Sequence, residues 1–335
     1  MRQASIRILV LLAAALGSAV PGRAVETDCL MRHPSTIIKR GDTYWIYGSG
    51  RGVRQFSSTD RLHWTDRGPA FPTEPAWVEK AVPNHRKGFL WAPDIHFFHG
   101  TYYLYYCAAT LGHNTSAIGL ATNATLDPAK WVDHGEVVRS PGPDPFNAMD
   151  PCIFLDASGK PWLSFGSYFS GIKVMALDPL TGTRPRPDSS ITTLAEHRVG
   201  RGNAIEASCI TYHDGWYYLF VNWGSCLKGD KSTYSIHVGR SRSVTGPYLG
   251  KRGVDMRDGG GTLLLGSDYD DGSGRSVSPE VGPGHAAILT VDGQDYFSCH
   301  YEWAKDKEGR TTVNIFKLTW DKGGWPDIAR AEQPL

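Results

Sequence analysis

The stretch Gly100-Thr-Tyr-Tyr-Leu-Tyr-Tyr106 decides the fold, because its turn glycine followed by an aromatic strand recurs along the chain. A short β-rich run precedes each copy, so each copy predicts a strand, a tight turn and an aromatic strand. The five copies begin, at spacings of 59, 59, 56 and 78 residues, at Gly41, Gly100, Gly159, Gly215 and Gly293. Repetition at such a period is typical of a fold built from stacked units.

Further strand candidates follow the hairpins, for example at Ala117–Thr122, Lys173–Leu177 and Ser235–Gly239, which leaves room for about four strands in each period. No long window outside the N-terminal region carries a helical apolar stripe, and 38 glycines and 21 prolines interrupt the chain throughout. We therefore predict an all-β, five-bladed β-propeller, which leaves only short sheet edges. The rival is a pair of β-sandwiches, but no change in composition marks a boundary.

The first 24 residues have the order of a secretory signal peptide. A start containing Arg2 and Arg7 leads into the apolar run 8–20, and small residues follow up to Ala24. The run is too short to cross a bilayer as a helix. We expect a signal peptide at 1–24 and a single propeller domain at 25–335, secreted or periplasmic and free of the membrane after cleavage.

Charge and composition favour a neutral substrate. The formal net charge is +1 and becomes −2 without the three arginines of the signal peptide, so no basic field indicates a nucleic-acid partner. Aromatic residues make up 11% of the chain and offer flat surfaces on which sugar rings stack. Of the six cysteines, Cys152 and Cys209 lie in apolar runs, and we expect them to be buried free thiols.

Titratable residues precede the first strand of every repeat. Because the innermost strand of each blade begins near the propeller axis, these residues are expected to meet in one central cavity. The five positions are His33-Pro34, Pro93-Asp94, Asp150-Pro151, Glu206-Ala207 and Gly284-His285.

Two carboxylates and two imidazoles around a narrow cavity suit the cleavage of a glycosidic bond, which needs a protonated acid and a second group on the opposite face of the sugar. Glu206 is the better acid, because its apolar surroundings and the neighbouring charge of Asp150 both raise a carboxyl pKa. Asp150 is then the partner that orients Glu206 and raises its pKa.

Other residues are candidates for contact with a sugar. Trp91 and Trp223 offer stacking surfaces, although tryptophans in strands usually belong to the core. Asn114, Ser116 and Asn147 are placed to bind a sugar or to hold the pocket. We interpret 222–229 as a loop at the pocket rim and 257–282, rich in Gly, Asp and Ser, as a surface excursion.

Taken together, these motifs resemble glycoside hydrolase family 43, the five-bladed arabinanases and arabinofuranosidases, from about Arg32 to Trp325. The motifs are His33-Pro-Ser-Thr-Ile-Ile-Lys39, Trp91-Ala-Pro-Asp-Ile95 with Tyr102-Tyr-Leu-Tyr-Tyr106, Asn114-Thr-Ser-Ala-Ile-Gly-Leu-Ala-Thr122, Asn147-Ala-Met-Asp150-Pro151, Gly202-Asn-Ala-Ile-Glu206-Ala207, Ser232-Thr-Tyr234 with Val238-Gly-Arg-Ser241, and Gly282-Pro-Gly-His285.

The resemblance implies an inverting hydrolase of L-arabinose-containing polysaccharide. It makes Glu206 the general acid and Asp150 the pKa modulator, and it assigns Asp94 to the pocket. It makes His285 the axial histidine that helps to hold a central ion, often calcium, largely through water. The runs Ser116-Ala-Ile-Gly119 and Gly282-Pro-Gly-His285 look most like the endo-arabinanase branch.

The first blade departs from the family pattern, which usually reads His-Asp-Pro-Ser with the Asp as general base. Here Arg32-His33-Pro34-Ser35 places His33 at the base position. Three explanations remain open. His33 activates the water itself, since a neutral imidazole is an able base near neutral pH; Asp28 or Asp94 reaches the water; or the protein binds sugar without cleaving it efficiently.

Arabinan or an arabino-oligosaccharide is thus the expected partner, and we expect a monomer. Two alternatives to an endo-arabinanase stay in view. One is a carbohydrate-binding or weakly active propeller with the same pocket. The other is an exo-acting α-L-arabinofuranosidase or β-xylosidase.

Overall fold

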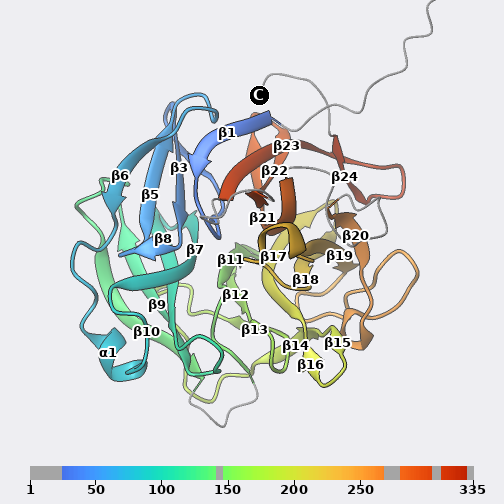
Figure 1. Ribbon diagram of the computed structural model, residues 1–335, viewed down its shortest axis with the longest axis horizontal. Coiled ribbons are helices and arrows are strands. Elements are labelled where there is room, and N and C mark those ends of the chain that lie inside the picture. Colours follow the sequence, from blue (N-terminus) through green and yellow to red (C-terminus); the bar gives the residue numbers. More distant parts are fainter. Residues whose placement is uncertain (1–24, 141–145, 268–279, 304–310, 330–335) are drawn as a thin grey trace, which may run out of the picture.

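Five antiparallel sheets radiate from a central axis in the computed structural model, which describes residues 25–140, 146–267, 280–303 and 311–329 (Figure 1). The predicted five-bladed β-propeller is therefore confirmed. The predicted signal peptide lies outside the described residues. No helix among those that are described is both long and apolar enough to span a bilayer.

Each blade runs from the hub outward in chain order. Blade 1 contains β2 (Ile38–Arg40), β3 (Thr43–Gly48), β5 (Arg54–Ser58) and β6 (Thr65–Pro69); blade 2 contains β7 (Phe89–Phe98), β8 (Thr101–Ala109), β9 (Ser116–Asn123) and β10 (Val132–Ser140), with β4 (Gly50–Arg51) added to β7; blade 3 contains β11 (Cys152–Leu155), β12 (Pro161–Phe165), β13 (Ile172–Ala176) and β14 (Thr192–Ala195); blade 4 contains β17 (Ile205–His213), β18 (Trp216–Trp223), β19 (Ser235–Ser241) and β20 (Thr262–Leu265). A two-stranded ribbon of β15 (Arg198–Val199) and β16 (Gly202–Asn203) precedes blade 4.

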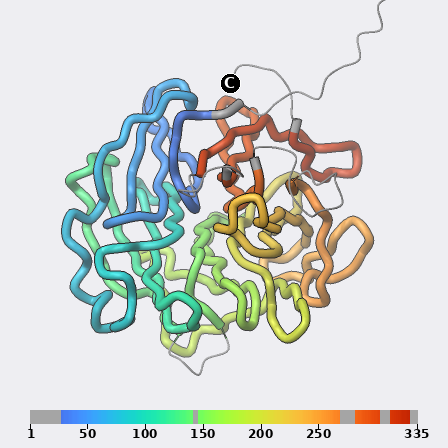
Figure 2. The backbone as a smooth tube through the Cα atoms, in the orientation of Figure 1, coloured from blue at the N-terminus to red at the C-terminus, as the bar shows by residue number. Residues whose placement is uncertain are grey.

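Blade 5 joins the two ends of the described chain. It contains β21 (Glu280–Val291), β22 (Gln294–Trp303) and β23 (Thr311–Trp320), and the outer edge of β23 pairs with both β1 (Val25–Leu30) and β24 (Pro326–Ala329). The Thr27 hydroxyl donates to the Val313 carbonyl at 2.6 Å across this seam. The first and last strands thus lie in one sheet, which closes the ring (Figure 2).

The turn glycines behave as the repeat predicts. All five have a positive φ, between 58° and 82°, a backbone region that glycine adopts without a steric penalty. In three hairpins the preceding residue is left-handed as well, at His99, Asp214 and Asp292. Two consecutive left-handed residues are typical of the tight turns that match the twist of paired strands.

Two segments differ from what their sequence indicates. The β-rich run before Gly41 forms a strand, β2, only from Ile38, because Ser35 instead exchanges hydrogen bonds with Tyr47 through its amide and its hydroxyl. The predicted surface excursion 257–282 contains β20, the outer strand of blade 4. The strand has only four residues, and the many small polar residues of the segment favoured a loop over a strand. Residues 268–279 of that segment lie outside the described residues.

Within the described residues, helical structure is confined to three short pieces. These are α1 (Trp77–Ala81) in the connection from β6 to β7, η1 (Gly229–Lys231) and η2 (Met256–Asp258). The core lies between neighbouring blades and includes aromatic contacts, as where Phe220 of blade 4 contacts Phe297 of blade 5 with ring centroids 6.0 Å apart. Cys152 and Cys209 are buried free thiols, as predicted.

The backbone turns in the same way at the hub end of every blade. One non-glycine residue there is left-handed, with φ between 36° and 54°: His33, Ala92, Asp150, Ala207 and His285. Such residues cost of order 1 kcal/mol or more and persist where the surrounding structure requires them. This repeated turn aims the start of each inner strand at the axis.

Asp94 links blades 1, 2 and 3 at the hub through hydrogen bonds. Its Oδ1 accepts the amide of Thr36 in blade 1 at 2.8 Å, and its Oδ2 accepts the amide of Ile153 in blade 3 at 2.9 Å. Asp94 itself is buried in blade 2, and burial raises its pKa while these two amides lower it. The carboxylate is therefore a structural link across the hub.

Replacing Asp94 with alanine should destabilise the protein by about 2–5 kcal/mol, because two buried amides lose their acceptor. Urea unfolding of Asp94→Ala measures the loss, and Asp94→Asn, which keeps one acceptor oxygen, should fall between it and the wild type. The exposed Asp66, paired with Arg54, provides the control Asp66→Ala. A loss below about 1 kcal/mol in Asp94→Ala would contradict the assigned link.

Candidate active site

A pocket of about 470 Å³ opens at the hub where the inner strands begin. This volume is within the range of small-ligand sites. Hub residues and the loops that join the second and third strands of blades 2, 3 and 4 line it. The hub contributes His33, Trp91, Asn147, Met149, Asp150, Glu206 and His285, and the loops contribute residues 110–113, 167–169 and 225–228. The expected rim loop 222–229 thus supplies part of the wall.

Asp150 and Glu206 are neighbours in the pocket. Glu206 Oε2 accepts a hydrogen bond from the Ser167 hydroxyl at 2.7 Å, and Asp150 Oδ2 accepts the amide of Ala207, next in sequence to Glu206, at 3.2 Å. Burial raises the pKa of both carboxyls, and the charge of Glu206 raises the pKa of Asp150 further. The pair therefore retains a proton at a pH where isolated carboxyls have lost theirs.

His33 faces the same pocket from blade 1. Its Nδ1 lies 2.7 Å from Ser49 Oγ, which also accepts the amide of Ala92 at 2.7 Å. Burial, helped by the charge of Arg32, lowers the pKa of His33 to about 4. The ring is therefore neutral near pH 7, and Nε2 is the nitrogen available to a molecule in the pocket.

Three imidazoles gather at the axis. The ring centroid of His33 is 4.6 Å from that of His285 and 5.5 Å from that of His300. Burial and the neighbouring histidines hold the pKa of His285 and of His300 well below the usual value. His300 was missed in the sequence, although it pairs with Gly284 across β21 and β22 and so follows from the hairpin register.

The axial residues fit a hydrated cation on the pocket side only. His285 lines both the pocket and a second space beneath it of about 20 Å³, which has room for about one water. Calcium takes six to eight oxygen ligands, whereas the three histidines offer nitrogen. The neutral His285 ring can supply one ligand, and water in the larger pocket must supply the others.

Trp223 does not line the pocket. Its ring is stacked between His197 and His237, at centroid distances of 3.8 and 3.6 Å. The preceding residue, Asn222, faces the hub instead: its Oδ1 accepts the amide of His285 at 3.1 Å and its Nδ2 donates to the Pro283 carbonyl at 2.9 Å. Successive side chains of a strand point to opposite faces, so Asn222 faces the hub and Trp223, which the sequence analysis named, faces away from it.

The polar candidates of blade 2 divide into one lining residue and two residues behind it. Asn147 lines the pocket; its Oδ1 accepts the Ser116 hydroxyl at 2.5 Å and its Nδ2 donates to the Ser167 carbonyl at 3.1 Å. Ser116 is fully buried. Asn114 donates to the Phe146 carbonyl at 3.5 Å and is also outside the lining. Ser116 and Asn114 therefore support the wall.

Neither alternative base is in the pocket. Asp28 is exposed on β1, at the outer edge of blade 5, and accepts the amide of Trp64 at 2.7 Å. Both oxygens of Asp94 are occupied by the amides described above, and Asp94 borders only the small space beneath the pocket. Of the candidates considered for the base, only His33 lines the pocket.

A buried carboxylate holds the rim loop of blade 4. Glu302, on β22 of blade 5, accepts the amides of Leu227, Lys228 and Gly229 at 2.7, 3.1 and 3.2 Å and the Ser232 hydroxyl at 2.7 Å. The loop also carries Cys226, whose Sγ lies 3.9 Å from Glu206 Oε1. Glu302 had no signal in the sequence, because its partners, three backbone amides and one hydroxyl, lie 70 or more residues away.

Aromatic side chains of the blade 3 loop were also missed. Tyr168 and Phe169 line the pocket, are partly exposed, and have positive φ values of 56° and 42°. They follow the second strand of blade 3, the same place in the blade as the predicted rim loop of blade 4. Applying that position to every blade would have found them.

Comparison with known proteins gives concordant matches. Residues 30–326 match the family model described as "Glycosyl hydrolases family 43". The extracellular exo-α-(1→5)-L-arabinofuranosidase ArbA of Cellvibrio japonicus (strain Ueda107) is 40% identical over 312 residues, covering 90% of this chain and 87% of that protein. The extracellular endo-α-(1→5)-L-arabinanase 1 of Bacillus subtilis (strain 168) is 43% identical over 298 residues, covering 88% and 86%. The structure of Cellvibrio cellulosa α-L-arabinanase complexed with arabinohexaose aligns with a TM-score of 0.82 at 38% identity, covering 90% of this chain and 95% of that chain.

Proposed function

The chain belongs to glycosyl hydrolases family 43, and from this premise we propose that it is an inverting endo-α-1,5-L-arabinanase that cleaves arabinan and arabino-oligosaccharides. Relatives named for arabinan hydrolysis cover nearly the whole propeller. The observation that carries the proposal is the pair of Asp150 and Glu206, which line one pocket where burial raises the pKa of both carboxyls.

In this proposal Glu206 protonates the leaving oxygen of the glycosidic bond. Ser167 positions its carboxyl, and burial raises the pKa of Glu206 and so favours the protonated form that general acid catalysis needs, with Asp150 beside it as the proposed pKa modulator. The apolar surroundings help, because desolvation penalises the ionised carboxylate. Trp91, Tyr168 and Phe169 supply ring faces for the sugar.

Endo action is supported by where the loops lie. Blades 2, 3 and 4 supply the lining loops, whereas the blade 1 loop between β3 and β5 adds no residue to the lining. An arabinan chain can therefore leave the pocket across blade 1. The exo-acting relative ArbA makes release of single sugars or short oligosaccharides from one end the competing outcome.

Glu206→Gln should lower kcat on debranched arabinan by about a hundredfold or more, because the amide cannot give a proton to the leaving group. Reducing-end release measures the rate, and product sizes at early times separate endo from exo action. Retained binding of arabino-oligosaccharide by the variant shows that the pocket is intact. A wild-type protein that binds arabinan without releasing reducing ends would make the alternative, a sugar-binding propeller, correct.

We further propose that His33 is the general base. Two hydrogen bonds to Ser49 Oγ, one from the Ala92 amide and one from His33 Nδ1–H, would leave the lone pair of His33 on Nε2, toward the pocket. The lowered pKa, about 4, keeps this nitrogen unprotonated over most of the pH range. His33 is therefore a weaker base than an ordinary histidine and is comparable in strength to a carboxylate.

The activity of the wild type should therefore fall only as the pH drops to about 4, where His33 becomes protonated, and not near 6.5. His33→Ala should lower kcat by about a hundredfold. Ser49→Ala should lower kcat by about tenfold, because the imidazole loses the hydrogen bond that fixes its tautomer. If His33→Asp raises activity by orders of magnitude, His33 is instead a substitution that impairs a former hydrolase site.

We propose that a hydrated calcium ion binds at the pocket side of His285. Such an ion would add positive charge near the two carboxylates and order water between them. Calcium added to chelator-treated protein should raise Tm by about 2 °C or more, and His285→Ala should abolish the rise. An equal rise in the variant would place any calcium elsewhere.

Secretion completes the proposal. Both relatives described above are named extracellular, and residues 1–24 have the signal-peptide order analysed above. Export would bring the hydrolase to a polymer too large to enter a cell.

A further inference from the structure

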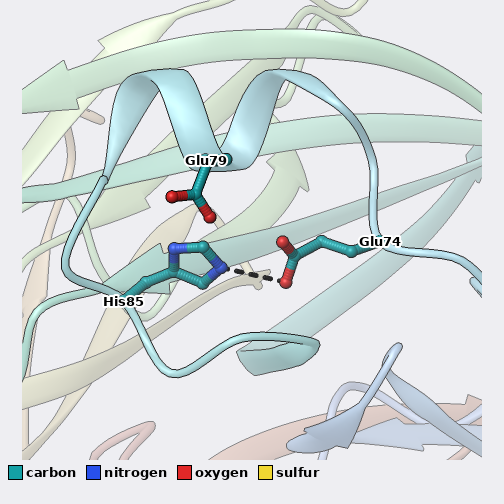
Figure 3. Close-up of side chains that lie close together, drawn as sticks. All are labelled: Glu74, Glu79 and His85. Carbon is teal, nitrogen blue, oxygen red and sulfur yellow. Dashed lines mark hydrogen bonds and ion pairs between the residues drawn. The ribbon is translucent and has the colours of Figure 1, made fainter.

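A second cluster of ionisable side chains lies far from the active pocket, in the connection from β6 to β7 that contains α1 (Figures 1 and 3). Glu74, Glu79 and His85 each offer one atom, and these three atoms lie within 4.8 Å of one another. None of the three residues lines the pocket at the hub. Among the described residues, this is the group of three His, Cys, Asp or Glu side chains whose ligand atoms lie close enough together to hold one metal ion.

The surroundings of His85 determine which of its nitrogens is available. The imidazole is fully buried, and Nδ1 lies 2.7 Å from the Val82 carbonyl, which can only accept. Nδ1 therefore carries the proton. A metal-binding histidine typically has its second nitrogen held in this way by a backbone carbonyl or a carboxylate.

Nε2 of His85 lies 2.9 Å from Glu74 Oε2, as the dashed line in Figure 3 marks. In the neutral imidazole, this contact brings two lone pairs together. Either a proton, held by the ring or by the carboxyl, or a metal ion must lie between them. Glu74 Oε2 also accepts the Gly88 amide, which fixes its direction.

Glu79 brings the second carboxylate from α1. Its side chain is about half exposed, and Lys87 Nζ lies 3.6 Å from Oε2, so a cation already occupies this side. Ligand atoms around a tetrahedral ion at about 2.0 Å stand roughly 3.3 Å apart. A rotation of the exposed Glu79 side chain is sufficient to close the remaining gap.

We propose that Glu74, Glu79 and His85 bind a divalent transition metal ion of the zinc class, with water as the fourth ligand. One imidazole and two carboxylates are ligands that zinc accepts. Calcium and magnesium prefer sites made of oxygen alone.

The ion would cross-link the connection that carries α1, since Glu74 and His85 flank α1 and Glu79 lies within it. This connection packs on blade 2, where Trp77 of α1 donates to the Tyr106 hydroxyl at 3.2 Å and lies over Gly119. Closing this segment would stabilise its packing on the sheet. The site is structural and separate from glycoside cleavage.

Zinc chloride titrated into untagged, chelator-treated full-length protein tests the proposal by calorimetry and thermal unfolding. Wild type should bind zinc saturably and gain about 2 °C or more in Tm. Glu79→Gln should weaken zinc binding at least about tenfold, because a ligand is lost. Lys87→Gln should strengthen it, because the competing ammonium is removed.

The matched control is Glu136→Gln, another partly exposed glutamate that pairs with a cation, Arg139, outside the cluster. It should bind zinc as the wild type does, and so separates the loss of a ligand from the loss of a surface charge. Zinc binding at the axial histidines would be equal in all four proteins. Absence of saturable binding, or identical binding in Glu79→Gln and Glu136→Gln, would overturn the proposal.

Discussion

The left-handed turn at the hub end of each inner strand is the constraint on which the rest of the structure depends. Five blades far apart in sequence place a non-glycine residue at φ between 36° and 54° at the same point. Only there do the strand starts converge closely enough for one carboxylate, Asp94, to bind amides of two neighbouring blades. The strain stored at these turns is offset by such links and positions the active groups.

The same convergence sets the electrostatics of the pocket. Desolvation acts on acids and bases in opposite directions: it raises the pKa of Asp150 and Glu206 and lowers the pKa of His33 and His285. Both shifts favour the uncharged form. A hub crowded with titratable groups can therefore carry little net charge, which suits a neutral sugar and leaves a proton where an acid catalyst needs it.

The sequence was sufficient to predict the fold, because the turn glycine and the aromatic strand after it recur once in each of the five blades. It also identified Glu206, Asp150, His33 and His285 as residues that meet at the hub. It could not separate Asn222 from Trp223, because one residue of register decides which side chain faces the axis. Nor could it find Glu302, whose backbone partners leave no side-chain pattern.

The seam between β1 and β23 has a consequence for how the molecule matures. Residues 286 positions apart meet there, so closing this seam carries a large loop-closure entropy and belongs to the slow, non-local part of folding. His33 follows β1 by only three residues. Closing the ring therefore also brings to the pocket the imidazole that we propose as the general base.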